Sequence, residues 1–463
     1  MDKRKGTAVA ILTLVGSLTA CSSTTSSTAP SASGSSSAPS TSTSSTASTG
    51  ASATSPSTSV APSASASGTT SLAWWARVQP VHKDEVKEFN TSHPNIQVTL
   101  TEVPDDQFVN KVGTGVRSTS GPDVLEFDVA NGPLFAATGV LGDITDRVNA
   151  LDYKDALDPG MGKLGRYGDK TFSVPSMAGP SILLYNRDLF KQAGLPDKAP
   201  TTWQEIMDDA KKIHALGKDI YGFDIPGACG GCLAFTAQPL IWASGGQTMT
   251  DASPDQKTTY ATSPQVADAF NFYHDMWKAG VANPAGQTQA GATWGQDFTA
   301  GKLGILLAGA WLIPAAEKAG HHVGVGPIPG KSGDFATFAG GNNIGVTSRT
   351  KKADVAWTFI QWLLEKEQQQ KRAAAGNVPV RGDALTDAMA AKYPEIAAQL
   401  DVSKKSNGPD SIATNALQLS ATSPWLAAFQ SIVFQDKDAA TALAKADDDS
   451  RKLIQQAYEQ VPQ

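Results

Sequence analysis

Apolar and polar positions alternate regularly after residue 70, and this pattern predicts the first folded elements. Residues 71–78 and 123–129 are typical of buried strands, and 95–103 alternates with the period of a strand. Residues 81–89 place apolar side chains among charges at helical spacing. Because strand–helix–strand order is typical of parallel sheets, we predict an α/β architecture.

Helix boundaries further along the chain are marked by capping residues. Thr202 and Glu205 form a capping-box pattern at the start of one amphipathic helix. Ser263 and Pro264 supply an N-cap and a first-turn proline for a second helix. Residues 353–375 have the apolar spacing of one long helix.

The N-terminal residues have the layout of a secretory signal. Basic residues at 3–5 precede an apolar stretch, 8–18, which is shorter than the ~20 residues that span a bilayer. Residues 18–21 (LTAC) resemble a bacterial lipoprotein box, and this resemblance implies lipid acylation at Cys21 after removal of the signal peptide, residues 1–20. The alternative is an ordinary signal peptide followed by an incidental cysteine.

Residues 21–70 are predicted to be the lipidated cysteine and a disordered tether. From 22 to 70 the chain contains only Ser, Thr, Ala, Pro and Gly, except for Val60. Such a composition buries too little apolar surface to offset the entropy of the chain. A flexible coil of this length has an r.m.s. span of roughly 35–40 Å.

Composition and charge exclude several classes of protein. The chain has 463 residues and a formal net charge of −6, and no basic run follows the first residues, which argues against a nucleic-acid partner. No phosphate-loop motif and no G-x-S-x-G nucleophile motif occurs in the sequence. The six histidines lack the spacing of a metal site. We therefore expect no cofactor, no metal and no catalytic residue.

Cys229 and Cys232 form a C-x-x-C motif inside IPGACGGCL, a segment rich in Gly and Pro. Neighbouring thiols oxidise outside the cell, so we predict a structural disulfide between them. Because closure of so short a loop gains little chain entropy, its predicted role is to shape the loop. Redox chemistry, metal binding and free thiols are the alternatives.

Several motifs are spread over residues 71–440, among them GPDVLEFD, DKTFSVPSMAGPSILLYNRDLFKQAGL, TWQEIMDDAKKI, DFTAGKLGILLAGAW and GNVPVRGD. In sequence and in order they resemble the extracellular solute-binding proteins of ABC sugar importers. The resemblance implies a type II periplasmic-binding-protein fold, in which two α/β lobes joined by a hinge enclose a ligand cleft. It places crossovers near 177–181 and 338–341. The implied lobes are 71–177 with 340–383, and 178–339 with 384–463.

Candidate ligand-binding residues follow from the chemistry of sugars. A pyranose presents an apolar face, on which aromatic rings stack, and a rim of hydroxyls, which carboxylates, amides and arginine satisfy. One of Trp74 and Trp75 must be core, and strand alternation does not decide which. The predicted sugar-binding residues are Trp75, Arg77, Glu126, Asp128, Gln238, Trp294 and Asn342 at strand ends and in loops, and Phe235, Trp311, Arg381 and Trp425 from the resemblance.

The resemblance implies a receptor rather than an enzyme. We expect reversible capture of a mono- or oligosaccharide by lobe closure, and delivery to ABC permease subunits that a separate ATPase drives. The protein is expected to act as a monomer at the outer face of the cell membrane, held by its lipid anchor. One alternative is a binding protein for a non-sugar solute. Another is a secreted glycoside hydrolase, which the common strand face of Glu126 and Asp128 disfavours, because catalytic carboxylates flank a glycosidic bond from opposite sides.

Overall fold

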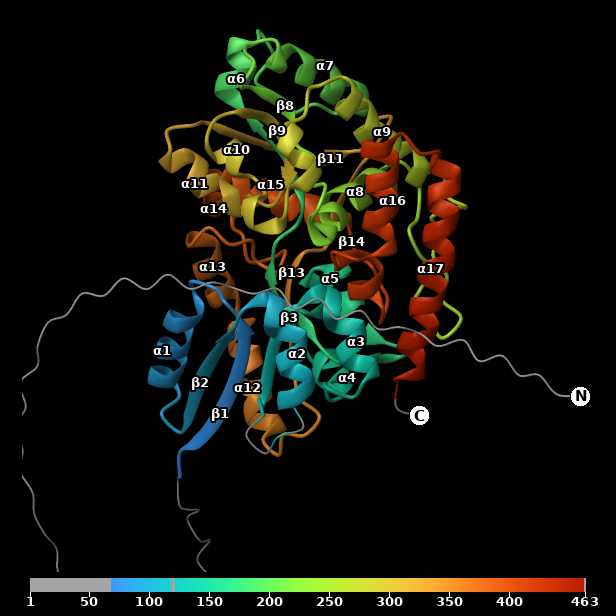
Figure 1. The fold of residues 1–463 in the computed structure, drawn as a ribbon. Helices are drawn as coiled ribbons and strands as arrows, with labels where there is room; N and C mark the ends of the chain where they lie inside the picture. Colours follow the sequence, from blue (N-terminus) through green and yellow to red (C-terminus); the bar gives the residue numbers. More distant parts are fainter. Residues whose placement is uncertain (1–67, 117, 119–120, 462–463) are drawn as a thin grey trace, which may run out of the picture. The chain divides into compact units, whose positions relative to one another are not determined.

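The computed structural model describes residues 68–116, 118 and 121–461, which lie in one compact unit (Figure 1). The predictions for the signal peptide, for Cys21 and for the tether up to residue 67 lie outside the described residues. Within the described ranges, no helix is long and apolar enough to cross a membrane.

Five strands form the first sheet, in the order β2-β1-β3-β13-β6. The strands β1, β2 and β3 are parallel, and β13 runs antiparallel to both of its neighbours. The three parallel strands lie where the apolar pattern predicts them. Because they are parallel, their carboxyl ends share one edge of the sheet. The strand bounds are β1 Thr70–Arg77, β2 Ile96–Val103, β3 Val124–Asp128, β6 Val174–Ala178 and β13 Gly341–Val346.

The helices that pack on the first sheet are α1 (His82–Ser92), α2 (Asp105–Gly115), α12 (Ala353–Leu363) and α13 (Lys366–Ala374). The prediction of one continuous helix over 353–375 is wrong. Glu365 adopts an extended ψ of 143° between α12 and α13. The side-chain amide of Gln369 compensates, because its Nε2 donates to the Leu363 carbonyl at 2.8 Å.

Four strands form the second sheet, in the order β10-β7-β9-β8, and a large apolar core lies between it and its helices. Helix α7 begins as predicted, because the Thr202 hydroxyl accepts a hydrogen bond from the Glu205 backbone N–H at 3.1 Å. Helix α9 begins at Pro264, also as predicted. The bounds are β7 Ile182–Asn186, β8 Tyr221–Phe223, β9 Leu303–Ala308, β10 Val323–Gly326, α7 Trp203–His214, α8 Gly230–Ala243, α9 Pro264–Lys278, α16 Pro424–Gln435 and α17 Ala439–Glu459.

Shorter elements connect these parts, including a small sheet in the order β11-β12-β14. Short helical turns lie at Pro284–Thr288, Gly291–Thr293 and Ala310–Leu312; the last contains Trp311, and Trp294 directly follows the second. The remaining bounds are α3 Gly132–Ala137, α4 Thr145–Asn149, α5 Pro159–Leu164, β4 Arg166–Tyr167, β5 Lys170–Thr171, α6 Arg187–Gln192, α10 Gln296–Thr299, α11 Ile313–Lys318, β11 Ile328–Pro329, β12 Phe335–Phe338, α14 Asp387–Lys392, α15 Pro394–Ser403 and β14 Ser406–Asn407.

Two connections between the sheets lie in contact with each other. One leads from β6 to β7, and the other leads from β12 to β13. The Thr337 hydroxyl donates to the Ser181 carbonyl at 2.6 Å. A Cβ atom at Gly340 would lie 2.4 Å from the Gly179 carbonyl oxygen, so this close approach requires glycine. The chain changes sheets at the predicted crossover positions, while the lobe boundaries stay a prediction.

Candidate functional site

Three predicted residues meet at the edge of the first sheet. Arg77, the last residue of β1, donates from Nη1 to Asn342 Oδ1 at 2.8 Å. The same guanidinium lies 3.2 Å from a carboxylate oxygen of Asp128, the last residue of β3. Because β1 and β3 are parallel and β13 begins beside them, this polar group is a direct product of the sheet register. We call Arg77, Asp128 and Asn342 the polar rim.

A buried network supports the polar rim from below. Asn342 Nδ2 donates to Glu126 Oε1 at 3.1 Å, and the Ser176 hydroxyl donates to the same oxygen at 2.9 Å. His82 Nε2 lies 3.4 Å from Glu126 Oε2. Burial opposes ionisation of Glu126, but the neighbouring His82, Arg372 and Asn342 stabilise the carboxylate and hold its pKa at about 2.

Glu126 therefore lies beneath the rim in this structure, and its contact with a ligand stays a prediction. Its side chain is fully buried. Glu126 lies in the middle of the sheet, paired with Ala76 on one side and Ile344 on the other, whereas Asp128 ends its strand. Glu126 and Asp128 are two residues apart on β3, yet the Glu126 carboxylate is buried beneath the rim and the Asp128 carboxylate is partly exposed at it.

Three other predicted residues form an aromatic cluster. The ring centroids of Phe235 and Trp311 are 5.6 Å apart, those of Trp294 and Trp311 are 5.9 Å apart, and those of Phe235 and Trp294 are 6.2 Å apart. Trp311 is 55% exposed, which is unusual for an indole. Its ring lies over the backbone of Gly309, where a Cβ atom would clash with it. We call Phe235, Trp294 and Trp311 the aromatic platform.

The aromatic platform adjoins the polar rim at the crossover between β12 and β13. A Cβ atom at Gly340 would lie 2.6 Å from Cε2 of Phe235, so that ring packs on the crossover backbone. Gly340 is two residues before Asn342 of the rim. The structure thus brings six of the predicted residues to the two sides of one short connection.

Two predicted residues lie in the core of the second sheet. Trp425 is fully buried, with ring centroids 4.6 Å from Phe270 and 5.1 Å from Tyr260. Gln238 is also fully buried, and its Nε2 donates to Gln418 Oε1 at 2.7 Å. Neither side chain faces solvent in this structure, and contact of either residue with a ligand stays a prediction.

Two more predicted residues lie away from the aromatic platform. The guanidinium of Arg381 donates to both carboxylate oxygens of Asp383, at 2.9 and 2.7 Å, and stacks 3.8 Å from the Tyr153 ring centroid. Trp74 is the core residue of its pair. Trp75 is half-buried and packs against α2, where its ring lies beside Gly115. In this structure Arg381 and Trp75 contact other parts of the chain, and their contact with a ligand stays a prediction.

The two nearby cysteines are joined by a disulfide. They occupy the beginning of α8 rather than an irregular loop. Cys229 is the N-cap of the helix, and its Sγ accepts a hydrogen bond from the Cys232 backbone N–H at 3.1 Å. Among the described residues, no group of three or more His, Cys, Asp or Glu side chains is placed to hold a metal ion.

A buried carboxyl group, that of Asp224, lies behind the aromatic platform. Burial is the main cause that raises the pKa of Asp224, and the nearby Asp297 adds to the rise, while the amide of Gln289 opposes it, so that the pKa is about 7. The amide of Gln289, oriented to donate, lies 3.0 and 3.2 Å from the two oxygens of Asp224. The group therefore titrates near neutral pH.

We expect Asp224→Asn to change the pH dependence of stability. A carboxyl group with a raised folded pKa binds more protons in the folded state than in the unfolded state between about pH 4 and pH 7. Its contribution to the free energy of unfolding therefore falls as pH rises through this window, by at most about 1.4 kcal/mol per pH unit. The variant should gain stability over the wild type across that window in urea unfolding measurements. A difference that stays constant from pH 4 to pH 8 would contradict the assignment.

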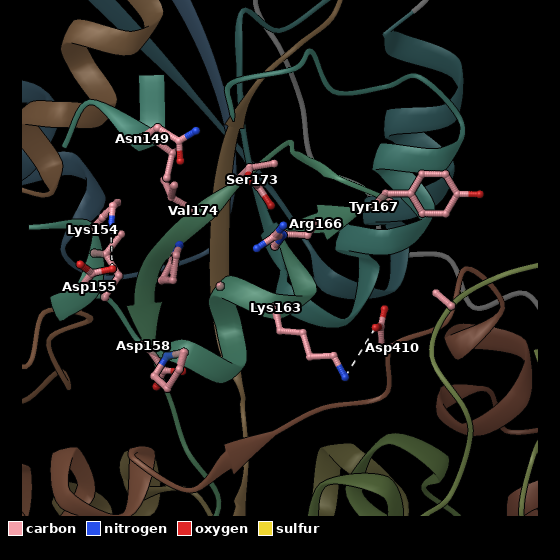
Figure 2. Close-up of a pocket in the computed structure, with 18 of the residues that line it drawn as sticks. Asn149, Lys154, Asp155, Asp158, Lys163, Arg166, Tyr167, Ser173, Val174 and Asp410 are labelled. Atoms are coloured by element: carbon pink, nitrogen blue, oxygen red, sulfur yellow. Dashed lines mark hydrogen bonds and ion pairs between the residues drawn. The ribbon is translucent and has the colours of Figure 1, made fainter. Parts of the chain in front are cut away.

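A hollow of about 770 Å³ lies apart from these residues (Figure 2). It is lined by charges of both signs, and Lys163 Nζ lies 3.1 Å from Asp251 and 3.8 Å from Asp410. None of the predicted sugar-binding residues lines it. The mutual pairing of its charges and the lack of an exposed indole distinguish it from the aromatic platform.

The sequence of this chain is similar to those of known solute-binding proteins. Residues 85–398 match the family described as bacterial extracellular solute-binding protein. The sn-glycerol-3-phosphate-binding periplasmic protein UgpB of Brucella abortus is 28% identical over 281 residues, which cover 57% of this chain and 63% of the relative. The diacetylchitobiose binding protein DasA of Streptomyces coelicolor is 26% identical over 286 residues, which cover 59% of this chain and 64% of the relative.

A solved structure shows the same fold. The cyclic alpha-maltosyl-1,6-maltose binding protein of Arthrobacter globiformis superimposes with a TM-score of 0.73, at 23% identity, over 84% of this chain and 100% of its own. The predicted α/β fold of the type II periplasmic binding proteins is confirmed.

Proposed function

The chain belongs to the bacterial extracellular solute-binding proteins, and from this premise we propose that it captures a neutral sugar outside the cytoplasm. The observation that carries the proposal is the aromatic platform beside the polar rim. An exposed indole offers a flat apolar surface to the C–H face of a pyranose. The guanidinium of Arg77 and the carboxylate of Asp128 then supply donors and acceptors for its hydroxyls, while the buried amide of Asn342 holds Arg77 in place.

The charge of the polar rim favours a neutral ligand over a phosphate ester. Arg77 is paired with Asp128 at 3.2 Å, so the rim carries compensating charges. A phosphate group needs an excess of cationic donors. UgpB is described as binding sn-glycerol 3-phosphate, whereas the descriptions of DasA and of the solved structure name oligosaccharides. The geometry of this chain supports the second type of ligand.

The proposed mechanism is reversible capture without covalent chemistry. The two sheets would approach each other about the paired crossovers, so that sugar contacts the platform and the rim together. We further propose that the closed form delivers sugar to ABC permease subunits served by a separate ATPase. Cys21 is proposed to carry the lipid anchor, which would keep a monomeric receptor at the outer face of the cell membrane.

Titration of the purified protein tests the proposal. Maltose, maltotriose, N,N′-diacetylchitobiose and sn-glycerol 3-phosphate should be added separately while tryptophan fluorescence and calorimetric heat are recorded. We expect saturable binding of at least one sugar and none of the phosphate ester. Binding of sn-glycerol 3-phosphate alone would replace the sugar proposal, and turnover of a chromogenic glycoside would revive the hydrolase alternative.

We expect Trp311→Ala to weaken sugar binding at least tenfold, or about 1.4 kcal/mol, because the stacking surface is lost. The side chain is 55% exposed, so the midpoint of thermal unfolding should change little. Trp277→Ala is the matched control, since that half-buried indole packs on Phe434 outside the platform. Equal affinity of Trp311→Ala and wild type in calorimetric titration would remove Trp311 from the site.

A further inference from the structure

The Cys229–Cys232 disulfide lies between the two elements that carry Phe235 and Trp294. Phe235 follows Cys232 by three residues in α8, so the two side chains lie on the same face of the helix. A Cβ atom at Gly291 would lie 3.5 Å from Cys229 Sγ and 3.8 Å from Cys232 Sγ. Gly291, the first residue of the turn Gly291–Thr293, therefore lies beside the disulfide with room for about one methyl group between them, and Trp294 follows the turn directly.

Hydrogen bonds join the same two segments on one side of the disulfide. The Ala228 backbone N–H donates to the Gln289 carbonyl at 3.0 Å, and the Gly227 backbone N–H donates to the Gly286 carbonyl at 2.8 Å. The Gln289 side chain reaches the buried Asp224. The loop from 284 to 294 is thus held against the start of α8 by backbone bonds, one buried carboxyl group and packing on the disulfide.

We propose that the disulfide is a positioning element of the binding site, which holds Phe235 and Trp294 in register as two parts of one aromatic platform. This inference rests on the proposed sugar-binding function. A dithiol reductant would transfer two electrons and two protons to the bond, the S–S bond would break into two thiols, and the reductant would become a disulfide. The start of α8 and the Gly291–Thr293 turn would then lose their shared support, and the platform would loosen.

The expected effect is local rather than global. A disulfide that closes so short a loop restricts the unfolded chain much less than one that closes a long loop. Cys229 is partly exposed, so a small reductant can reach its sulfur. The Cys229 Sγ also caps α8, and a serine hydroxyl can accept the same hydrogen bond. The double variant Cys229→Ser/Cys232→Ser therefore removes the covalent bond while it keeps the cap.

The test compares wild type and the double variant, each with and without dithiothreitol, in two measurements. The first is affinity for maltose, maltotriose and N,N′-diacetylchitobiose. The second is hydrogen–deuterium exchange of residues 286–294, which needs no ligand. We expect the reduced wild type and the variant to bind sugar at least fivefold more weakly and to exchange faster in this segment, with nearly unchanged midpoints of thermal unfolding. Dithiothreitol should not affect the variant.

The possible outcomes separate this inference from the proposed function. If mass spectrometry shows free thiols at Cys229 and Cys232 but affinity and exchange are unchanged, the positioning role is wrong and the sugar-binding proposal stands. If the oxidised protein binds no sugar, the proposed function fails, and the exchange of residues 286–294 alone decides the positioning role. A large loss of thermal stability in the variant would show a global role and overturn the inference.

Discussion

Trp425→Ala is expected to lower the free energy of unfolding by about 3–5 kcal/mol and to leave sugar affinity close to that of wild type. The indole is fully buried among the aromatic side chains of the second sheet's core, which includes Phe270 and Tyr260. Its removal leaves a cavity that packed neighbours can fill only in part. Urea unfolding gives the stability change, and calorimetric titration of folded variant gives the affinity.

Trp311→Ala is the natural counterpart of this variant. Both indoles were predicted to stack on sugar, but one is buried and the other is exposed. The expected results are therefore opposite, with stability lost in one variant and affinity lost in the other. If Trp425→Ala kept its stability and lost sugar binding, the indole would have to reach the ligand through a rearrangement of α16.

Arg372→Met is expected to cost about 3–5 kcal/mol of unfolding free energy, because it leaves buried carboxylates without their counter-charge. Arg372 is almost fully buried, and it donates to both oxygens of Glu85, at 2.6 and 3.1 Å. It also donates to the Ser176 carbonyl and contributes to the ionised state of Glu126. Chemical unfolding at pH 7 measures the loss.

The neighbouring residue provides a matched control. Lys371 forms ion pairs with Glu88 and Glu367, but its side chain is 46% exposed. Solvent screens such pairs, so Lys371→Met should cost only about 0–1 kcal/mol. The double variant Arg372→Met/Glu85→Gln should recover part of the lost unfolding free energy, because it also removes one of the buried carboxylates that the single variant leaves unpaired. Equal losses at positions 371 and 372 would contradict the assigned role of the buried pair.

Apolar spacing and capping residues predicted those strands and helix ends that are stabilised by residues close in the sequence. The period of residues 95–103 and the Thr202 cap are examples, since each depends on contacts within one turn or one strand. The break at Glu365 was not predicted. At this break the amide of Gln369 donates to the Leu363 carbonyl in place of a helical backbone N–H. Apolar spacing does not record that alternative hydrogen bond.

Strand ends predicted which polar residues meet at the edge of the first sheet, although Asn342 among them is buried. Arg77, Asp128 and Asn342 lie at such ends, and the sheet register brings them together. Glu126 and Trp425 have the same chemistry as rim and platform residues, but distant segments cover them. Burial of that kind depends on tertiary contacts, which residue type and short-range spacing do not encode.

Residues that support the site were harder to predict. Phe338 packs on Phe235 with ring centroids 5.4 Å apart, and Ser176 and His82 hold the carboxylate beneath the rim. The sequence around each of these three residues gives no sign that it lies next to the site. The position of Phe338 directly before the paired glycines of the crossover is the one sequence signal that could have identified it.

The contact between the Phe235 ring and Gly340 has a thermodynamic consequence. Any change in the angle between β12 and β13 must alter this packing, so the crossover conformation and the state of the ring are linked equilibria. If a ligand immobilises Phe235 and thereby favours one crossover angle, a substitution that favours the same angle strengthens ligand binding, by a factor no larger than its effect on the crossover equilibrium. Affinity in this protein is therefore open to adjustment from backbone positions that no sugar touches.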